Sequence, residues 1–374
     1  MRASTATSKS ILLEYIIKRR WLGNGLLILV GLFAVYRLAV ELINNPILFF
    51  QQVINGLQLG FVYALIALGY TMVYGIVRLI NFAHGDVFMV GAFISFYGVT
   101  RLQLHTWVSS VFPSFPPVAA QIIGAVTVVL LAMVTCSVLA FTIERVAYKP
   151  LRNAPRISAL ITAIGVSFFL EYFGALSFVF SPNFITYKRP FDVTTWYLNK
   201  GGIASLQSGQ AIPPGSVIFS NIFVIIVISS ILLMLALQYI VRNTKVGKAM
   251  RAAAYDKPTA RLMGINVDGI ISVTFGIGAA FAGAAGMLYA IAFPQVFFWM
   301  GIIPGLKAFV AAVLGGIGSI PGAFVGALIM GQAEVLSAAY ISTPMRDAIA
   351  FSILIIVLLI RPTGIFGEPT REKA

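Results

Sequence analysis

Long apolar stretches without a charged residue dominate this chain. Residues 117–143 and 221–241 are two of them, and each is long enough to cross a bilayer core of roughly 30 Å, which takes about 20 helical residues. The 374 residues are 59% hydrophobic and 10% charged, with a mean hydropathy of +0.94. Ordinary soluble domains are about one quarter charged. The sequence therefore predicts an all-α, polytopic membrane protein.

The apolar runs also set the expected membrane spans. The unbroken spans are expected near residues 22–40, 50–76, 82–100, 118–142, 157–180, 217–241, 268–292 and 346–361, and a broken pair is expected across 302–339. In that pair, the glycines and Pro321 of GGIGSIPG (Gly315–Gly322) cannot comfortably continue one helix. The span at 22–40 lacks a small-residue cleavage site and is expected to stay on the chain. The prediction is about nine spans with broken or re-entrant helices.

Basic residues predict the orientation of these spans. The net charge is +14, and more than half of the 26 Lys and Arg residues fall within residues 1–20, 144–156 and 242–261. Because cytoplasmic loops are enriched in Lys and Arg, all three stretches and the N-terminus are expected in the cytoplasm. The loops 101–117 and 181–216 then lie outside. Charge arranged in this way does not indicate nucleic-acid binding.

The expected side of the membrane for the C-terminal tail depends on how the broken pair crosses. If 302–339 passes twice, or enters and leaves at one face, residues 361–374 end in the cytoplasm, whereas a single pass would put them outside. The first arrangement is preferred.

The loop at 242–261 has the marks of a short helix. It carries six basic residues and one acid, and it lies between two apolar runs. Asp256 suits the N-cap, Pro258 the first turn, and Gly264 a left-handed exit. Such a capped helix of about two turns could seat in a groove of a partner and transmit its motion. The alternative is an ordinary interfacial turn.

Polar residues inside apolar surroundings are candidates for a translocation path. Asn81, His84 and Asp86 lie in RLINFAHGD, where irregular backbone at membrane depth would need to line a cavity or be packed in protein. His84 and Asp86 could instead cap a helix near the interface. Glu334 could face a path or be satisfied by a neighbouring helix, and for Glu171 packing is preferred.

Two further features bear on packing and partners. Gly56-x-x-x-Gly60, Gly322-x-x-x-Gly326 and the run 276–286 are expected to bring helices close together, as small residues do in lipid. The long outer loop 181–216 is polar, aromatic and rich in Pro and Gly, and it could be a docking surface or a solvated connector.

Several chemistries have no support in the sequence. Cys136 is the single cysteine, so no disulfide or cysteine metal site is expected. His84 and His105 are the two histidines, and no paired carboxylates or nucleophile elbow accompany them. Lys248 follows a glycine, but the residues around it do not form a P-loop. We expect no catalytic residue, no metal ligand and no cofactor bound by this chain.

Several stretches together resemble one known family. GFVYALIALGYTMVYGIVRLINFAHGDVFMVGAF (60–93), IERVAYKPLR (143–152), RAAAYDKPTARLMGINVD (251–268), the segment 300–343 and PTGIFG (362–367) are similar to the LivH-type permease of branched-chain amino acid ABC importers. The resemblance covers nearly all of 51–367. The N-terminal segment and the loop 181–216 depart from it. It implies three parts: an N-terminal extension with an additional transmembrane helix (1–46), an ABC permease transmembrane domain (47–367) and a cytoplasmic tail (368–374).

The resemblance also implies partners and a location in the inner membrane. A second permease of the LivM type, two cytoplasmic ATPases that bind ATP and Mg²⁺, and a periplasmic amino-acid-binding protein are expected, with lipid around the bundle. The family's ATPase-contacting loop maps onto residues 253–265, so the residues expected to couple the chain to the ATPases are Ala253, Ala254, Asp256, Lys257, Ala260, Leu262, Gly264 and Ile265. The residues expected along the translocation path are Asn81, His84, Gly85, Asp86, Gly315, Gly316, Gly318 and Glu334.

Three alternatives share parts of this pattern. A urea or amide ABC importer would share every motif quoted, and uptake competition would separate the two. An ion-coupled secondary transporter also uses broken helices, but the capped basic loop argues against it. A purely structural scaffold is disfavoured because broken segments at membrane depth need a cavity or protein packing.

Overall fold

The computed structural model describes residues 31–33, 35–77, 81–152, 154–199, 201–206, 211–361 and 363–367. Residues 31–33 and 35–44 are helical, in agreement with the second half of the span expected at 22–40. The basic stretch 1–20, the start of that span and the tail 368–374 lie outside the described residues.

Two long helices form the centre of the bundle. They are α2 (Pro46–Val77) and α10 (Val267–Ala292), and α3 (His84–Thr100) is buried beside α10. Helices α5 (Pro117–Ile143), α6 (Arg156–Gly174) and α7 (Asn221–Asn243) surround this centre and bury much less of their surface. Apolar residues exposed on these three helices suit contact with lipid or with another membrane-embedded subunit.

The third group of helices lies on both sides of the break in the predicted pair. It comprises α11 (Ile302–Gly315), α12 (Ile320–Tyr340) and α13 (Arg346–Ile360). The break at Gly315–Gly322 is confirmed, because α11 ends at Gly315 and Gly316 and Gly318 adopt φ values of 105° and 96°. Together α11 and α12 pack against α2.

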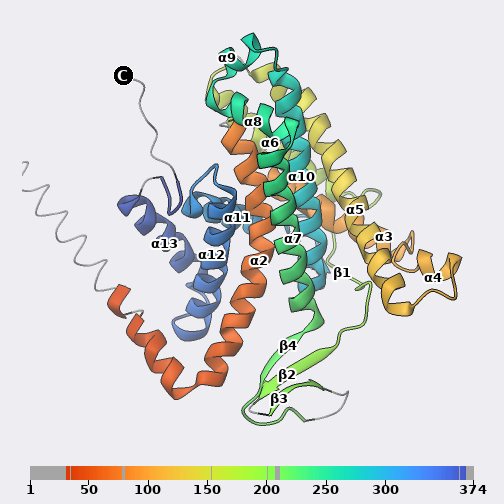
Figure 1. The fold of residues 1–374 in the computed structure, drawn as a ribbon, viewed down its shortest axis with the longest axis vertical. Helices are drawn as coiled ribbons and strands as arrows, with labels where there is room; N and C mark the ends of the chain where they lie inside the picture. The colour runs from red at the N-terminus through yellow and green to blue at the C-terminus, as the bar shows by residue number, and fades with distance from the viewer. Residues whose placement is uncertain are drawn as a thin grey trace, which may run out of the picture.

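Short elements mark the two ends of the bundle (Figure 1). One end carries α8 (Lys245–Tyr255) and α9 (Lys257–Leu262), and we call it the α9 end. The other end carries a meander in which β2 (Thr195–Asn199) pairs with β3 (Gly202–Leu206) and with β4 (Val217–Ser220), and we call it the sheet end. The basic loop 242–261 and the polar loop 181–216 therefore lie at opposite ends, as expected.

The remaining elements are connectors. Strands β1 (Ile185–Thr186) and β5 (Gln295–Val296) pair antiparallel, α4 (Trp107–Val111) precedes α5, and η1 (Glu144–Tyr148) and η2 (Lys149–Leu151) continue α5 at the α9 end. The strands were not expected from the sequence. They lie in the loop 181–216 and its neighbours, and the bundle itself is helical.

Helix lengths change the expected number of full spans. Six helices of the described chain are long and apolar enough to cross a membrane: α2, α5 with its continuation, α6, α7, α10 and α12. By contrast, α3, α11 and α13 have 17, 14 and 15 residues, so α11 is only about 21 Å long. The polytopic helical class is confirmed, but a count of about nine full spans is not.

Glycines allow the central helices to cross at backbone contact. A Cβ atom on Gly60 of α2 would lie 2.9 Å from the Cα atom of Leu328 on α12, and one on Gly331 would meet the backbone of Gly56 and Gly60. A Cβ atom on Gly326 would likewise meet the backbone of α11. Side chains larger than hydrogen cannot fit at these crossings, which confirms the close packing expected from the small-residue spacing.

Helix α3 begins inside the bundle rather than at its end. The ring of His84, its first residue, lies against Gly69 of α2. Gly69 precedes the end of α2 at Val77 by eight residues, or about 12 Å. The chain therefore turns back into the bundle between α2 and α3, which agrees with the expectation of irregular backbone at membrane depth near Asn81.

The C-terminal residues return to the α9 end. The backbone N–H groups of Ile365 and Phe366 donate to the carbonyls of Leu314 and Gly315, at 3.0 and 2.9 Å. The neighbouring Gly318 lies close to Gly75, near the α9 end of α2. This places residues 363–367 on the same side of the bundle as the basic loop 242–261, the side expected if 302–339 passes twice.

Candidate functional site

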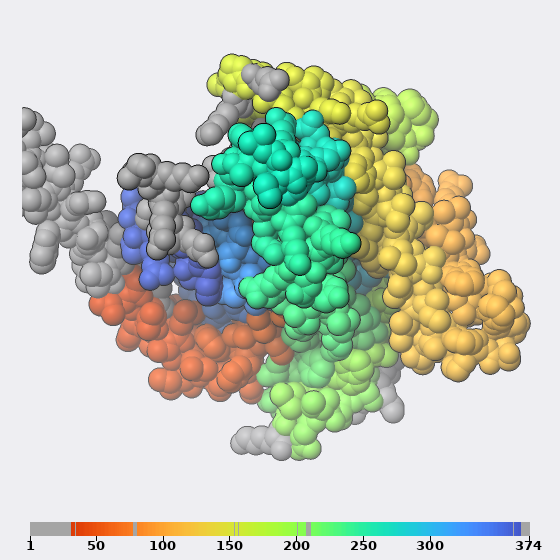
Figure 2. Space-filling model, turned by 45° about the horizontal axis from the view of Figure 1, so that its top comes forward, coloured from red at the N-terminus to blue at the C-terminus, as the bar shows by residue number. Residues whose placement is uncertain are grey.

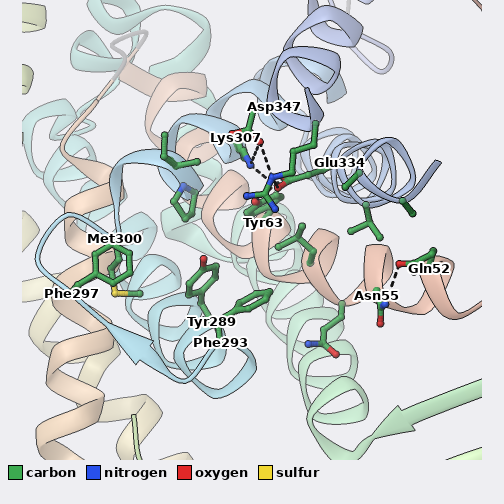
Figure 3. Close-up of a pocket in the computed structure, with 18 of the residues that line it drawn as sticks. Gln52, Asn55, Tyr63, Tyr289, Phe293, Phe297, Met300, Lys307, Glu334 and Asp347 are labelled. Atoms are coloured by element: carbon green, nitrogen blue, oxygen red, sulfur yellow. Dashed lines mark hydrogen bonds and ion pairs between the residues drawn. The ribbon is translucent and has the colours of Figure 1, made fainter. Parts of the chain in front are cut away.

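A cavity of about 800 Å³ opens in the sheet-end half of the bundle (Figure 3). Its walls come from α2, α10, α11 and α12, the start of α13 and the loop before α11. Amide side chains of Gln52, Asn55 and Gln58 line its α2 side. A cavity this size, with a few converging polar groups, is where a small-molecule ligand is expected.

Four charged side chains gather at one side of this cavity. The Lys307 ammonium lies 2.6 Å from the Glu334 carboxylate and 2.8 Å from that of Asp347. The Arg346 Nε atom lies 3.3 Å from Asp347, and the Tyr63 hydroxyl donates to Glu334 at 3.1 Å. Figure 3 shows Lys307, Glu334, Asp347 and Tyr63 converging from different helices. Because Lys307 and Glu334 are buried, each needs the other to offset its loss of hydration.

The opposite wall of the cavity is aromatic. Tyr289 and Phe293 project from the end of α10 with ring centroids 4.8 Å apart, and Phe297 and Trp299 follow at 5.1 Å from each other. In Figure 3, Phe293 and Phe297 lie across the cavity from the charged residues. The cavity can therefore hold a small molecule that has both charged groups and an apolar part.

A second site is the pair of short helices at the α9 end. The Asp256 side chain caps α9 by accepting from the Thr259 N–H at 3.1 Å, and Thr244 caps α8 by accepting from the Gly247 N–H at 3.0 Å. After α9 the chain leaves through Gly264 at φ 80°. The helix predicted from the sequence, with its N-cap, its proline in the first turn and its glycine exit, is confirmed.

This pair of helices has two distinct faces. Met250, Ala253 and Ala260 are buried against the bundle. On the outside, Tyr255, Leu262 and Met263 are 80%, 87% and 77% exposed. Figure 2, with the α9 end turned forward, shows α8 and α9 as a raised mass on the surface. Exposed apolar residues grouped at such a tip are typical of surfaces that contact another protein, a membrane or a ligand.

An ion bridge connects this surface to the helices behind it, because the guanidinium of Arg261 on α9 lies 3.5 Å from the carboxylate of Asp268 on α10. Beneath α8 and α9 lies a cavity of about 600 Å³, where the Arg152 guanidinium pairs with the carboxylates of both Glu144 and Asp268. The Lys257 ammonium also donates to the Val77 carbonyl at the end of α2, at 3.2 Å. Displacement of α8 and α9 would therefore act on α2, on the continuation of α5 and on α10.

Replacing Arg152 with glutamine is expected to destabilise the chain by on the order of 2 kcal/mol, because the buried Glu144 loses its charge partner. Partial exposure of Arg152 keeps the effect below that of a fully buried pair. Thermal unfolding of the purified protein measures it. The matched control is Arg145→Gln, because Arg145 is exposed and forms no ion pair within the described chain. Equal unfolding temperatures for the two variants would contradict the role of the bridge.

The first group of predicted path residues is buried among helices. His84 packs edge-on against Tyr70 with ring centroids 4.6 Å apart, and Asn81 accepts a hydrogen bond from the Tyr148 hydroxyl at 2.7 Å. The Asp86 carboxylate accepts from Ser167 of α6. The N-cap of α3 is Ala83, without a side-chain bond, so the alternative in which His84 or Asp86 caps this helix is wrong. Their role along a path stays a prediction.

The second group of predicted path residues lies in two different places. Gly315 and Gly316 are buried where α11, α12 and the C-terminal residues meet, and Gly318 is exposed there. The cavity of about 800 Å³ lies elsewhere, and of the eight predicted path residues Glu334 alone is among those that line it. Gly85 contacts Gly301 and Gly305, where α3 meets the start of α11. Glu171, for which packing was preferred, is buried on α6.

Three members of the charged cluster, Lys307, Arg346 and Asp347, were not predicted from the sequence. Lys307 stands within the apolar run of the predicted broken pair, and Arg346 and Asp347 are the first two residues of the last predicted span. A lysine inside a membrane segment is a signal by itself, because an unpaired charge there is costly. Glu334 in the same pair supplies the opposite charge, so the two could have been considered together.

Apolar helices long enough to cross a membrane and a cavity among them are what a membrane transport protein requires. The family described as "Branched-chain amino acid transport system / permease component" matches residues 52–358, and the chain belongs to it. LivH of Salmonella typhimurium, a high-affinity branched-chain amino acid transport system permease protein, is 44% identical over 329 residues, which cover 87% of this chain and 97% of the relative.

More distant relatives carry similar names. BraD of Pseudomonas aeruginosa is 40% identical over 325 residues, covering 87% of this chain and 98% of BraD. A probable LivH of Methanocaldococcus jannaschii is 26% identical over 319 residues, covering 81% of this chain and 88% of that relative. No solved structure matches the chain.

Proposed function

We propose that this chain is the permease subunit of an ATP-driven importer that moves branched-chain or other neutral amino acids into the cytoplasm. The observation that carries the proposal is the cavity of about 800 Å³, with opposite charges on one side and aromatic rings on the other. A neutral amino acid has this division of charged and apolar groups. The names of its relatives in two bacteria supply the substrate class.

The proposed source of energy lies outside the chain. Two cytoplasmic ATPases would bind ATP and Mg²⁺ and hydrolyse the ATP, while this chain binds no cofactor of its own. Rigid-body motion of the ATPases would act on α8 and α9, which would transmit it to the central helices through the contacts of Arg261 with Asp268 and of Lys257 with Val77. A second permease of the LivM type would complete the translocation cavity, and a periplasmic binding protein would deliver the amino acid.

The proposed orientation follows from charge. Loops 144–156 and 242–261 line the same cavity at the α9 end, and both are basic. The positive-inside rule then assigns the α9 end to the cytoplasm, and the basic charge of residues 1–20 assigns the N-terminus to the cytoplasm by the same rule. The β2–β3–β4 sheet would face the periplasm, where the binding protein arrives. A cysteine at Lys257 would react with an impermeant reagent in open membranes but not in intact spheroplasts, and labelling of intact spheroplasts would reverse this orientation.

Reconstitution tests the proposed function directly. The chain is co-purified with its ATPases, second permease and binding protein, and [³H]leucine uptake into proteoliposomes is measured with and without ATP. ATP-dependent uptake that unlabelled leucine abolishes and urea does not is the expected result. Competition by urea would instead support a urea or amide importer. Uptake that proceeds without the ATPases would support an ion-coupled secondary transporter.

Replacing Leu262 with aspartate is expected to reduce co-purification of the ATPases by tenfold or more. The side chain is 87% exposed, so the change costs the chain's own fold little and acts on the surface offered to a partner. The measurement is the amount of ATPase recovered with tagged permease. Leu102→Asp is the matched control, because Leu102 is also exposed but lies beyond α3, toward the sheet end. Unchanged recovery for Leu262→Asp would remove α9 from the proposed contact.

A further inference from the structure

Two members of the charged cluster face the cavity and two lie behind them. The side chains of Arg346 and Asp347 are 48% and 42% exposed, whereas those of Lys307 and Glu334 are 2% and 5% exposed. All four line the cavity of about 800 Å³. A ligand in this cavity would therefore meet Arg346 and Asp347 first, supported from behind by the buried Lys307–Glu334 pair.

The Arg346 guanidinium has hydrogen-bond donors that could bind a ligand. It approaches the carboxylates of Asp347 and Glu334 through Nε, at 3.3 and 3.7 Å. Its two terminal nitrogens donate no hydrogen bond to any residue in the described part of the chain. A guanidinium binds a carboxylate best in a fork, with two parallel N–H···O bonds, and a lysine cannot reproduce this geometry.

An acceptor for a cation stands next to this fork. Asp347 neighbours Arg346 in sequence, and its carboxylate shares the Lys307 ammonium with Glu334. Because Asp347 is also half exposed to the cavity, it can accept hydrogen bonds from a ligand's ammonium group. The cluster thus presents a guanidinium and a carboxylate side by side. These charges are complementary to the α-carboxylate and the α-ammonium group of an amino acid.

The far wall suits the rest of such a ligand. Phe293 and Phe297 supply apolar surface across the cavity from the charged residues, and Trp299 lines the cavity beside Phe297. An aliphatic side chain placed there would be removed from water, at about 0.8 kcal/mol per buried CH₂ group. Glycine or urea would leave this surface unfilled.

We infer that Arg346 and Asp347 form the subsite for the backbone groups of the transported amino acid, with Arg346 binding the α-carboxylate through its terminal nitrogens and Asp347 accepting the α-ammonium. The aliphatic side chain then lies on the aromatic wall. The inference rests on the proposed function and adds to it the residues that read the substrate.

Thiol labelling in the full-length protein tests this subsite without the binding protein. Ile303 lines the same cavity and is partly exposed, so Ile303→Cys provides a reporter, while the native Cys136 is buried. Membranes washed free of binding protein are labelled with a maleimide in the presence of leucine, of leucinamide, which lacks the carboxylate, or of 4-methyl-2-oxopentanoate, which lacks the ammonium. Leucine should slow labelling at concentrations at least tenfold lower than either analogue requires.

A variant in the same background tests Arg346 itself. Arg346→Lys keeps the charge but loses the fork, so leucine protection should require at least a tenfold higher concentration, while protection by leucinamide should not change. Arg101→Lys is the matched control, because Arg101 is exposed at the end of α3 and does not line the cavity. The control should behave like the parent.

Several outcomes would overturn the inference. Equal protection by leucine and leucinamide would do so, as would an Arg346→Lys variant within threefold of the parent. Absence of any protection while the assembled transporter still takes up leucine would reject the subsite and leave the proposed function standing. Failure of leucine uptake by the assembled wild-type transporter would reject the proposed function itself. If Arg346→Lys does not insert, the comparison of leucine with its two analogues decides the matter.

Discussion

Replacing Lys307 with methionine is expected to destabilise the chain by about 3 kcal/mol. The side chain is 2% exposed, and its ammonium lies 2.6 Å from the carboxylate of the buried Glu334. Without it, Glu334 retains the Tyr63 hydroxyl and a more distant Arg346 at 3.7 Å, which do not replace a contact ion pair. Loss of the Lys307 ammonium costs Asp347 less free energy, because its side chain is partly exposed and can be hydrated.

Thermal unfolding of the detergent-purified protein measures this effect. The informative comparison is the double variant Lys307→Met with Glu334→Leu, which removes both buried charges. Apolar residues can replace a buried ion pair at little cost, so the double variant should unfold at a higher temperature than Lys307→Met alone. A double variant less stable than Lys307→Met alone would contradict this expectation. It would show that Glu334 stabilises the bundle even without its Lys307 partner.

Replacing Gly91 with valine is expected to cost about 3 kcal/mol or more and to reduce the amount of folded protein in the membrane. A Cβ atom at this position of α3 would lie 2.5 Å from the Cα atom and 2.9 Å from the carbonyl oxygen of Gly283 on α10. Helix α10 cannot easily retreat, because a Cβ atom at Gly283 would in turn lie 2.7 Å from the Ala132 carbonyl on α5. Overpacking against backbone is costly because no side chain can rotate away.

Limited proteolysis of membranes and thermal unfolding both report the outcome. Gly165→Ala is the control, because a Cβ atom at Gly165 on α6 meets no atom within 4 Å. The control should change stability by less than about 1 kcal/mol. Similar behaviour of the two glycine variants would mean that α3 and α10 do not cross at backbone contact.

Features of this chain that depend on local chemistry could be predicted from its sequence. The positions of the long helices follow from apolar runs, because the thickness of a bilayer fixes the length a span must have. Capping of α9 by Asp256 and its exit through Gly264 involve groups within a few residues of one another. The break at Gly315–Gly322 follows from glycine and proline in the same way.

Features that depend on distant residues were less accessible. Helix α3 is mostly apolar, and the His84 and Asp86 side chains in its first turn do not indicate that it starts about 12 Å inside the end of α2. That depth is set by contact between His84 and Gly69. The strands of 181–220 also escaped prediction, because short pairs such as Thr195–Asn199 with Gly202–Leu206 depend on their partner strands.

Composition and short-range sequence patterns predict the class of this protein, the approximate positions of its long helices and the two basic loops that share one end. Each of these follows from composition and from residues that are neighbours along the chain. The tertiary structure decided which charges meet. Lys307 and Glu334 are 27 positions apart on different helices, and Arg346 and Asp347 begin a third. The physical reason is that a buried charge in a membrane bundle must find an opposite charge. The packing of the helices decides which opposite charge lies within reach of each buried charge.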